Sequence, residues 1–568
     1  MMKRRNFLKK IGFAAGVPIA FQGVPLTVMG SHQRLQRLAA QSDNDRVIIM
    51  IQLHGGNDGL NTVIPLSNYD EYYSRRANIA IPYKVGNRTL IPLDSTIAAE
   101  DQVGVHPDMH DFKHLYDVGK AAVFQGVSYE NNNGSHFRGR DIWFMGGDSD
   151  EYLSSGWIGR YLGKEYEPLS YPADFPTTEM PDPLALEMGN DVSLLFHQEG
   201  NIPTSISLGS NPSNLESLIN QLEGFVDEGI DPRGNPPGFL NNSPYGQEMN
   251  WILGLEEKSE TYIRRLSEIY DSAAETSVTY PETYPFNSPT GAKRNPLSNQ
   301  LKLIARLMAG GVKTKVFLVK MGGFDTHASQ VESNDPTMGL HGALLYHISS
   351  AMRAFLSDLR SRGMEDRALA LTMSEFGRRI GSNGSYGTDH GTGGPILMFG
   401  LGVKQGIYGT VPDVSQSNVG LQFDYRQVYS NILHDWMGVD KDVITNDIFF
   451  RNFIDGANPA GGNYEPMDLI KEVILGEKDV LKSKYRIQSL YPNPATNYTQ
   501  VKIQVNNYQD VKLQLIDVNG RIVSEFVRRV SPGEHTFSFM LDGVNPGFYF
   551  IKAKSQLLDD TKRLLVRK

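Results

Sequence analysis

The stretch Arg46-Val47-Ile48-Ile49-Met50-Ile51-Gln52-Leu53, followed at once by His54-Gly55-Gly56-Asn57-Asp58-Gly59, decides the fold class of this chain. Its first part is a nearly continuous apolar run, which is typical of a strand buried on both faces of a sheet. Its second part is a glycine-rich turn that carries a histidine and an aspartate. In open α/β folds, ligands bind in the loops that follow the carboxyl ends of such strands.

Further apolar runs of the same kind follow along the chain. They lie at residues 121–127, 314–319, 368–373 and 395–399. Apolar residues spaced three and four apart predict helices between them, including one at 298–308 and one at 341–362. Buried strands that alternate with helices indicate a largely parallel sheet covered by helices on both faces. We therefore predict an α/β fold for the central part of the chain.

Composition narrows the class of protein further. The chain has 568 residues, of which 40% are hydrophobic and 21% are charged, so we expect one large globular domain with smaller attachments. The formal net charge is −9 and no long basic run follows the first ten residues, which excludes nucleic acid as a partner. The chain contains no cysteine, so any metal must be held by nitrogen and oxygen ligands.

The amino terminus has the pattern of an export signal. Lys3-Arg4-Arg5-Asn6-Phe7-Leu8-Lys9 precedes a moderately apolar run at 11–29, which we do not expect to be a permanent membrane span. The Arg-Arg-x-Phe-Leu-Lys core resembles the twin-arginine signal, whereas the alternative is a basic amphipathic helix. The resemblance implies the twin-arginine translocase as a partner and the periplasm as the compartment of transit.

The carboxyl terminus changes to a strand period. Apolar and polar residues alternate at 501–505 and 511–515, and turn signals at 519–520 and 545–547 predict a small β-sandwich. Leu490-Tyr491-Pro492-Asn493-Pro494-Ala495 and the basic last residues resemble the type IX secretion sorting domain. The resemblance implies the type IX machinery as a partner and the cell surface or the medium as destination. The alternative is an ordinary carbohydrate-binding sandwich.

These patterns divide the chain into four predicted segments. Residues 1–40 form the signal peptide and a spacer, and residues 41–465 form the α/β domain. Residues 466–484 form a linker, and residues 485–568 form the sorting domain.

Acidic residues and histidines gather where the predicted strands end. They are Asp58, Asp325 with His327, and Glu375, whereas His390 leads into a strand instead of following one. Carboxylates and imidazoles that converge at one sheet edge suit one or two divalent cations, such as zinc, manganese or calcium. The alternative is that these groups cap helices and satisfy loop backbone.

A second polar stretch follows the run at 121–127. It contains Ser135, His136 and Arg138 and leads into a helical pattern. A serine at a helix N-terminus can face an anion, a histidine can act as ligand, acid or base, and an arginine can bind a sulfate or phosphate with two hydrogen bonds. The alternative is an Asn/Gly-rich turn in which Ser135 is only the helix cap.

Together these motifs resemble the domain-of-unknown-function family fifteen-oh-one, from residue 46 to residue 452. The motifs that carry the resemblance are Leu53-His54-Gly55-Gly56-Asn57-Asp58-Gly59-Leu60-Asn61, Ser135-His136-Phe137, Gly156-Trp157-Ile158-Gly159-Arg160, Gly323-Phe324-Asp325-Thr326-His327, Ser374-Glu375-Phe376-Gly377-Arg378 and Asp389-His390-Gly391.

That family in turn looks like a distant relative of the alkaline phosphatase and sulfatase superfamily. The resemblance implies metal ligation by Asp58, Asp325, His327, Glu375 and His390, with Ser135 as nucleophile or metal-held hydroxyl. It implies that Arg138 or Arg378 stabilises charge on the substrate. Phe376 stands where the superfamily usually has a histidine, and Ser135 lacks the surrounding motif for conversion to formylglycine.

The leading hypothesis is therefore an exported, metal-dependent hydrolase of sulfate or phosphate esters, including those of polysaccharides. The alternative is a non-catalytic surface protein that binds or scaffolds and retains the fold, which Phe376 favours.

Overall fold

The computed structural model describes residues 19–21, 24–26, 45–167, 169–178, 180–189, 192–200, 202–208, 261–471, 486–505, 509–517, 521–531, 533–555 and 559–567. Except for the short strands β1 (Ile19–Phe21) and β2 (Val24–Leu26), the predicted signal peptide lies outside the described residues. Residues 472–484 of the predicted linker also lie outside them. The chain divides into two compact units, Met1–Lys471 and Glu472–Lys568.

A nine-stranded sheet forms the centre of the first unit, and its strands run in the order β13-β10-β14-β3-β15-β16-β9-β17, with β18 also paired to β9. Their bounds are β3 Val47–Leu53, β9 Ala121–Ser128, β10 Ala185–Met188, β13 Ser205–Leu208, β14 Val316–Met321, β15 Ala368–Met373, β16 Gly394–Phe399, β17 Gly406–Tyr408 and β18 Phe423–Asp424. All five predicted runs are strands of this sheet.

Most neighbouring strands are parallel, which confirms the predicted fold class. Strand β3 pairs in parallel with β14 on one side and with β15 on the other. Strand β16 is the exception, because it runs antiparallel to both β15 and β9.

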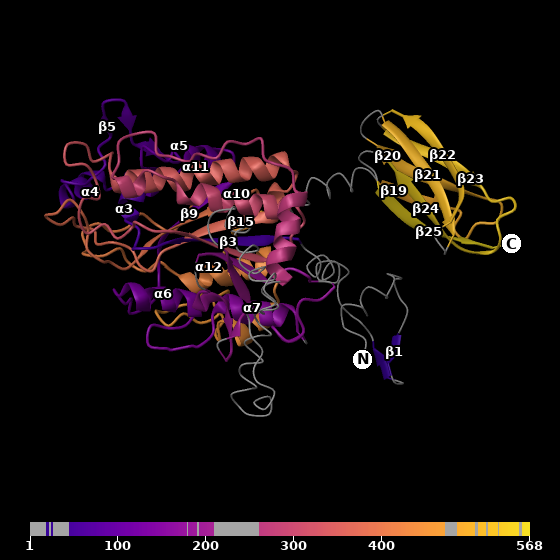
Figure 1. Ribbon diagram of the computed structural model, residues 1–568, viewed down its shortest axis with the longest axis horizontal. Coiled ribbons are helices and arrows are strands. Elements are labelled where there is room, and N and C mark those ends of the chain that lie inside the picture. The colour runs from indigo at the N-terminus through magenta and orange to yellow at the C-terminus, as the bar shows by residue number, and fades with distance from the viewer. Residues whose placement is uncertain are drawn as a thin grey trace, which may run out of the picture. The chain divides into compact units, whose positions relative to one another are not determined.

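Helices cover both faces of the sheet (Figure 1), with α5, α10 and α11 on one face and α6, α7 and α12 on the other. Successive residues of β3 explain this arrangement: Ile49 and Ile51 pack into one core, while Ile48 and Met50 pack into a second core. A strand that is apolar at every position needs a cover on both sides, because neighbouring side chains point to opposite faces.

The α-helices of the described residues are α3 Gly59–Thr62, α4 Tyr69–Arg75, α5 His110–Asp117, α6 His136–Met145, α7 Trp157–Glu165, α10 Pro296–Ala309, α11 Leu340–Ser361, α12 Tyr425–Asn431 and α13 Lys441–Val443, and residues 261–272 are also helical. Short 3-10 and π segments are η1 Ala99–Asp101, η2 Leu194–Phe196, η5 Thr290–Ala292, η6 Glu365–Arg367, η7 Ile432–Trp436 and η8 Ile444–Ile448. Small accessory strands are β4 Val63–Pro65, β5 Lys84–Val85, β6 Arg88–Thr89, β7 Ile91–Pro92, β8 Val103–Val105, β11 His197–Gln198 and β12 Ile202–Pro203.

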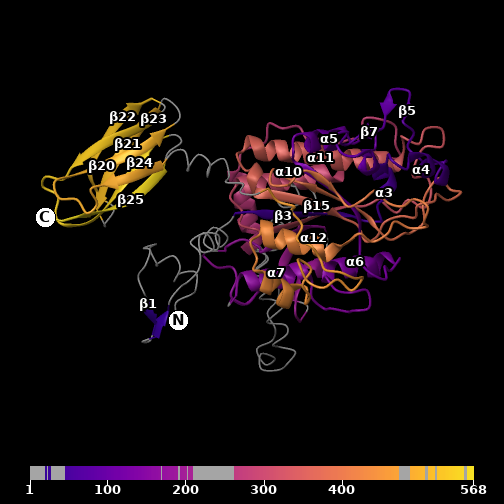
Figure 2. The same ribbon diagram turned by 180° about the vertical axis from the view of Figure 1, so that it is seen from behind.

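The second unit is all β (Figure 2). It has a sheet in the order β19-β20-β23 and another in the order β22-β21-β24-β25. The strands are β19 Arg486–Tyr491, β20 Tyr498–Val505, β21 Gln509–Asp517, β22 Ile522–Val530, β23 Gly533–Met540, β24 Gly547–Lys554 and β25 Asp559–Val566. Alternate residues such as Val501, Ile503, Leu513 and Leu515 form its core, as the predicted period of two requires.

Candidate metal centre

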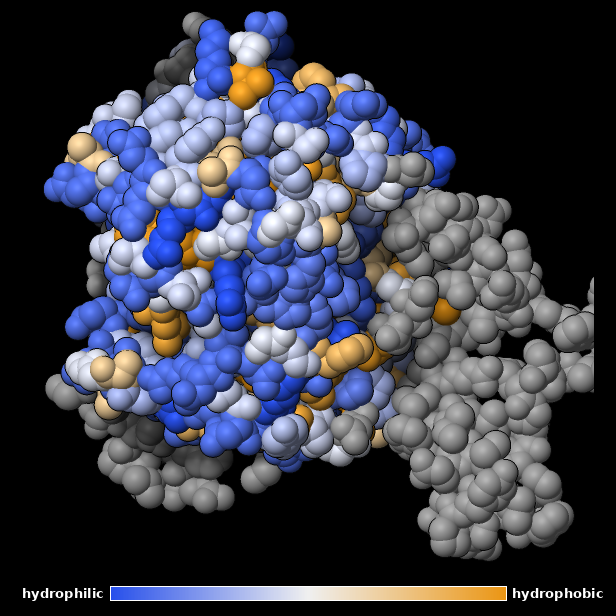
Figure 3. Space-filling model, turned by 90° about the vertical axis from the view of Figure 1, so that its left-hand side faces the viewer, coloured by the Kyte–Doolittle hydropathy of each residue, from blue (hydrophilic) through white to orange (hydrophobic). Residues whose placement is uncertain are grey.

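Four polar loops meet at one edge of the central sheet. His54 follows β3, Asp325 and His327 follow β14, Glu375 follows β15, and His136 begins the helix that follows β9. His390 reaches the same edge although it precedes a strand, because β16 is antiparallel and therefore starts where its neighbours end. The surface of the first unit at this end is mainly hydrophilic, with scattered apolar patches (Figure 3).

Three imidazoles and one carboxylate converge in what we call the histidine cluster, made of His136, Asp325, His327 and His390. The Nε2 atom of His327 lies 2.9 Å from Nε2 of His390 and 3.4 Å from Oδ1 of Asp325. The Nε2 atom of His390 lies 3.6 Å from Oδ1 of Asp325. The Nε2 atom of His136 lies 3.5 Å from Oδ2 of the same carboxylate.

This spacing fits a small divalent cation. A tetrahedral zinc with ligand bonds of about 2.0–2.1 Å holds its ligand atoms about 3.3 Å apart. The four donor–donor distances given above run from 2.9 to 3.6 Å and bracket that value. A donor set of imidazoles with one carboxylate suits zinc or manganese better than calcium, which prefers oxygen ligands throughout.

The opposite nitrogen of each histidine in the cluster faces an acceptor. Nδ1 of His136 lies 2.8 Å from Oε1 of Glu375, and Nδ1 of His390 lies 2.7 Å from the carbonyl of Gly134. Nδ1 of His327 lies 3.5 Å from a carboxylate oxygen of Asp389. An acceptor at Nδ1 places the proton there and leaves the Nε2 lone pair free, which is the usual support of histidine metal ligands.

Glu375 is the buried carboxylate beneath the cluster, and only 1% of it is exposed. Its Oε1 accepts a hydrogen bond from the Gly55 amide at 2.8 Å and lies 3.3 Å from Nδ1 of His54. Its Oε2 is buried without a partner among the described residues. An unpaired oxygen on a buried carboxylate is costly, and a nearby cation would offset that cost. His54, His136 and Glu375 thus form a second group with the spacing of metal ligands.

Burial and neighbouring charges set the protonation states of Asp325 and His390. Partial burial raises the pKa of Asp325, but the Arg378 guanidinium and the neighbouring imidazoles outweigh it, and the net shift is downward. Burial lowers the pKa of His390, and the positive field of Arg378 adds to this effect. Asp325 is therefore ionised and His390 neutral near neutral pH, which are the protonation states that bind metal.

Arg378 lies beneath the site and fixes its loops. Its side chain is fully buried and donates hydrogen bonds to the carbonyls of Gly55, Gly56, Phe324 and Thr388. It also donates to Oδ1 of Asp325 at 2.7 Å. With these contacts, Arg378 positions the loops and Asp325. The predicted charge-stabilising role requires a side chain that a substrate can contact, whereas the side chain of Arg378 is buried.

Asp58 belongs to a buried network outside the histidine cluster. Both of its oxygens accept hydrogen bonds from Arg76 at 3.0 Å, and Oδ2 also accepts one from Gln330 at 2.5 Å. The Oε1 atom of Gln330 in turn accepts hydrogen bonds from Thr326 at 2.8 Å and from Thr388 at 3.1 Å. The geometry gives Asp58 a supporting role and does not bring it to the predicted position of a metal ligand.

The side chains of Ser135 and Arg138 differ in how far other contacts hold them. Ser135 is exposed, occupies the N-cap position of α6 and makes no capping hydrogen bond with its side chain. Its hydroxyl is therefore free beside His136. Arg138 instead donates to the carbonyls of Ser149 and Glu151 and stacks 3.9 Å from the ring centre of Tyr152. These contacts do not orient Arg138 towards the cluster.

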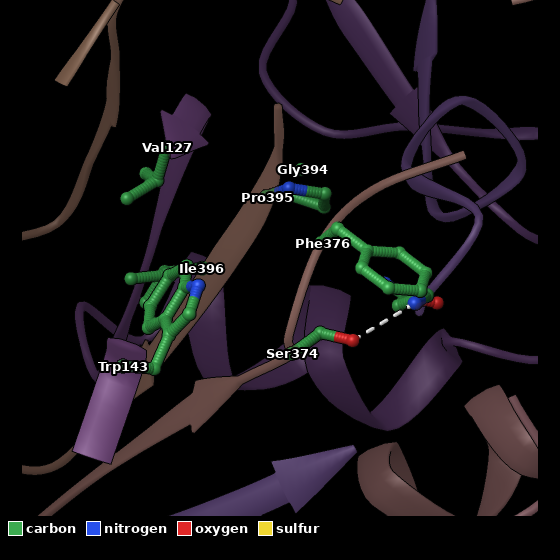
Figure 4. Close-up of a pocket in the computed structure, with 8 residues that line it drawn as sticks. Val127, Trp143, Ser374, Phe376, Gly394, Pro395 and Ile396 are labelled. Atoms are coloured by element: carbon green, nitrogen blue, oxygen red, sulfur yellow. Dashed lines mark hydrogen bonds between the residues drawn. The ribbon is translucent and has the colours of Figure 1, made fainter. Parts of the chain in front are cut away.

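Phe376 fills the place next to Glu375 and is 2% exposed. Its ring centre lies 4.4 Å from that of His390 and 4.9 Å from that of His136, so it packs against two imidazole rings of the cluster. Beside it lies a cavity of about 10 Å³ that Trp143 and Ser374 also line (Figure 4). This is room for about one water molecule. The Nε1 group of Trp143 is buried without a partner among the described residues and would donate to such a water.

Fold and site together define an α/β protein with a candidate metal centre at the carboxyl edge of a largely parallel sheet. Residues 257–453 match the family described as "Protein of unknown function (DUF1501)". Residues 489–567 match the family described as "Secretion system C-terminal sorting domain". The predicted resemblances to these two families are confirmed, the first over residues 257–453 of the predicted 46–452, and the sorting tail indicates export to the cell surface or secretion.

Similar solved structures come from the alkaline phosphatase and sulfatase group. A protein in the alkaline phosphatase superfamily from Vibrio parahaemolyticus has 10% identity and a TM-score of 0.31, covering 90% of this chain and 88% of that chain. The PsFucS1 sulfatase from Pseudoalteromonas sp. has 11% identity and a TM-score of 0.31, covering 90% and 87%. The alkaline phosphatase from the Antarctic bacterium TAB5 has 11% identity and a TM-score of 0.23, covering 64% and 94%.

No curated protein matches the chain in sequence. Among the described residues, no helix combines the length and the apolar character needed to cross a membrane.

Proposed function

We propose that the first unit is a metal-dependent hydrolase of sulfate or phosphate esters that acts after export. The observation that supports it best is the convergence of three imidazole nitrogens on the carboxylate of Asp325, with distances of 3.4, 3.5 and 3.6 Å. Donors at this spacing, each histidine supported at its other nitrogen, suit a bound cation better than a set of helix caps.

The revised ligand set is His136, Asp325, His327 and His390, with His54 and Glu375 as the neighbouring group. A zinc or manganese ion held there would supply Lewis-acid polarisation of an anionic ester oxygen. Half of the Asp325 side chain and 47% of the His327 side chain are exposed, so a substrate can approach the donors from solvent.

Ser135 is the proposed nucleophile. Its free hydroxyl precedes α6, whose first-turn amides have no acceptor within the helix and point outward from its N-terminus. Such amides bind sulfate and phosphate oxygens. His136, held by Glu375 through Nδ1, directs its Nε2 to the same region and fixes the start of the helix relative to Asp325.

The first test is metal analysis of the purified full chain. We expect near-stoichiometric zinc or manganese, and we expect Asp325→Ala and His136→Ala to release it. Asp413→Ala serves as the control, because Asp413 is an exposed loop carboxylate outside the cluster. A chain that binds no divalent metal would support the non-catalytic binding or scaffold alternative.

The second test is turnover of a panel of sulfate and phosphate esters by the metal-loaded protein. Ser135→Ala should abolish turnover and retain the metal, because Ser135 is not among the ligand groups. Full activity of Ser135→Ala would remove it as nucleophile, and inactivity of the wild type on every ester would contradict the proposed function.

A further inference from the structure

Beside the histidine cluster lies an open groove of about 430 Å³. We call it the amide groove, and its lining residues are Ser128, Tyr129, Glu130, Asn131, Asn132, Thr392 and Leu421. Its volume is within the range of small-molecule sites, which runs from about 300 to 1,000 Å³.

The walls of the amide groove are continuous with the loops of the candidate metal centre. One wall, from Ser128 to Asn132, leads directly to Ser135 and His136, and Thr392 on the other wall lies two residues beyond His390. The two walls are joined at the site itself, because Nδ1 of His390 donates to the carbonyl of Gly134 at 2.7 Å. A substrate with its ester group at the cluster would therefore extend its remaining atoms into this groove.

Hydrogen-bonding groups interrupt a mainly apolar lining, and their fixed contacts leave hydrogen-bonding capacity free. Thr392 donates its hydroxyl to the carbonyl of Val419 at 2.6 Å, so its oxygen can still accept. The hydroxyl oxygen of Tyr129 accepts from the Asn133 amide at 3.2 Å, so its proton can still be donated. Asn131 is exposed and makes no side-chain hydrogen bond to another described residue, which leaves both ends of its carboxamide free.

Asn131 is held outward by its backbone, whose φ of 54° is in the left-handed region that asparagine tolerates better than most residues. Leu421 is 39% exposed and adds an apolar surface to the opposite wall. One free carboxamide and two hydroxyls near an aliphatic side chain suit a ring that carries hydroxyl groups on its rim and C–H groups on its face.

The charge of the amide groove restricts the ligand further. None of its lining residues is lysine or arginine, and Glu130 contributes an exposed carboxylate. A second sulfate or phosphate on the substrate would meet this carboxylate without a compensating cation. We infer that the amide groove binds the neutral, hydroxyl-rich part of a sugar that carries a single sulfate or phosphate ester, an inference that rests on the proposed function.

The kinetic test compares kcat/KM of the metal-loaded chain for sugars with one and with two anionic ester groups. Glucose 6-phosphate and glucose 6-sulfate are the single esters, glucose 1,6-bisphosphate is the double ester, and p-nitrophenyl phosphate and sulfate lack sugar hydroxyls. We expect the single sugar ester to exceed the other two types by about tenfold. Glu130→Gln should raise kcat/KM of the double ester relative to that of glucose 6-phosphate by about three- to tenfold.

Matched variants distinguish a role of the amide groove in substrate choice from a general effect of substitution on activity. Asn131→Ala should lower the ratio of sugar ester to aryl ester, while Glu268→Gln, an exposed carboxylate outside the groove, should change neither ratio. Equal turnover of all three substrate types, or unchanged ratios in both groove variants, would overturn the sugar inference while the hydrolase proposal stands.

A binding test distinguishes failure of the groove from failure of the proposed function. If every ester is inert, the hydrolase proposal fails. Saturation-transfer NMR then measures binding of methyl glycosides of glucose, galactose, mannose and fucose to the groove. Saturation of any of these neutral sugars that is lost in Asn131→Ala supports the groove as a sugar subsite. No saturation of any of the four, or equal saturation in the variant, overturns it.

Discussion

Replacement of Gln330 tests whether the buried network sets the geometry of the candidate metal centre. Gln330, Thr326 and Thr388 are all 0% exposed. The side chain of Gln330 connects the loop of Asp58 with the loops that carry Asp325 and His390. Leucine has nearly the volume of glutamine, so Gln330→Leu removes the hydrogen bonds without opening a large cavity.

The expected cost follows from the groups that lose their partner. Two buried threonine hydroxyls lose an acceptor, and Asp58 loses one charge-assisted donor but keeps Arg76. At roughly 1–2 kcal/mol for each of these three groups, Gln330→Leu should lower the free energy of unfolding by about 3–6 kcal/mol. Metal affinity should also fall, by less than the roughly 10- to 100-fold that follows loss of a direct partner of a metal ligand, because Gln330 reaches the ligand loops only through Thr326 and Thr388.

Urea unfolding of the full chain measures the first effect, and competition with a chromophoric zinc chelator measures the second. Gln416→Leu is the control, because Gln416 lies in an exposed loop and its amide contacts only Asp413 and Ser415. A loss of less than about 1 kcal/mol in Gln330→Leu, with unchanged metal affinity, would refute the view that this network holds the three loops in register.

Three further predictions concern metal, pH and export. At a metal concentration about a hundredfold above Kd, removal of the metal by a chelator should lower the free energy of unfolding by about 2.7 kcal/mol. The stability of Asp325→Ala should not respond to the chelator. Thermal unfolding with and without EDTA measures both effects. Burial lowers the pKa of His341 to about 4, so the unfolded chain binds more protons than the folded chain between pH 6.5 and 4. As the pH is lowered through this range, the free energy of unfolding should decrease by up to about 3 kcal/mol. His341→Gln should flatten this part of a pH series of urea midpoints, and an unchanged slope would contradict the assignment. Deletion from Tyr485 should leave the melting temperature of the first unit unchanged and retain the protein in the periplasm, whereas normal surface delivery of the shortened chain would argue against the sorting role.

The long apolar strands and their shared edge were predictable from the sequence, because a strand buried on both faces has an uninterrupted apolar signature. The short strands β10, β13, β17 and β18 were not predicted, since runs of two to four residues carry no period. Their place in the sheet depends on pairing with strands far away in the chain.

The choice between residues of one loop could not be made from the pattern. The pattern of His54-Gly55-Gly56-Asn57-Asp58 favoured Asp58 as the metal ligand, but the structure brings His54 to the candidate centre and buries Asp58. Gly55 and Gly56 have φ of 123° and 81°, and a Cβ on Gly55 would lie 2.1 Å from the Asp325 amide nitrogen. This turn decides which side chain faces outward, and its direction depends on contacts with residues 324–325.

The antiparallel direction of β16 has a consequence for how this site can change. Strands β15 and β16 are adjacent, so residues 374–393 form one long hairpin connection whose two ends lie a single strand spacing apart. Glu375, Arg378 and His390 all lie within this one insert. This part of the candidate centre can therefore be lengthened, shortened or exchanged between related proteins as a single unit, while the strand order beneath it stays the same.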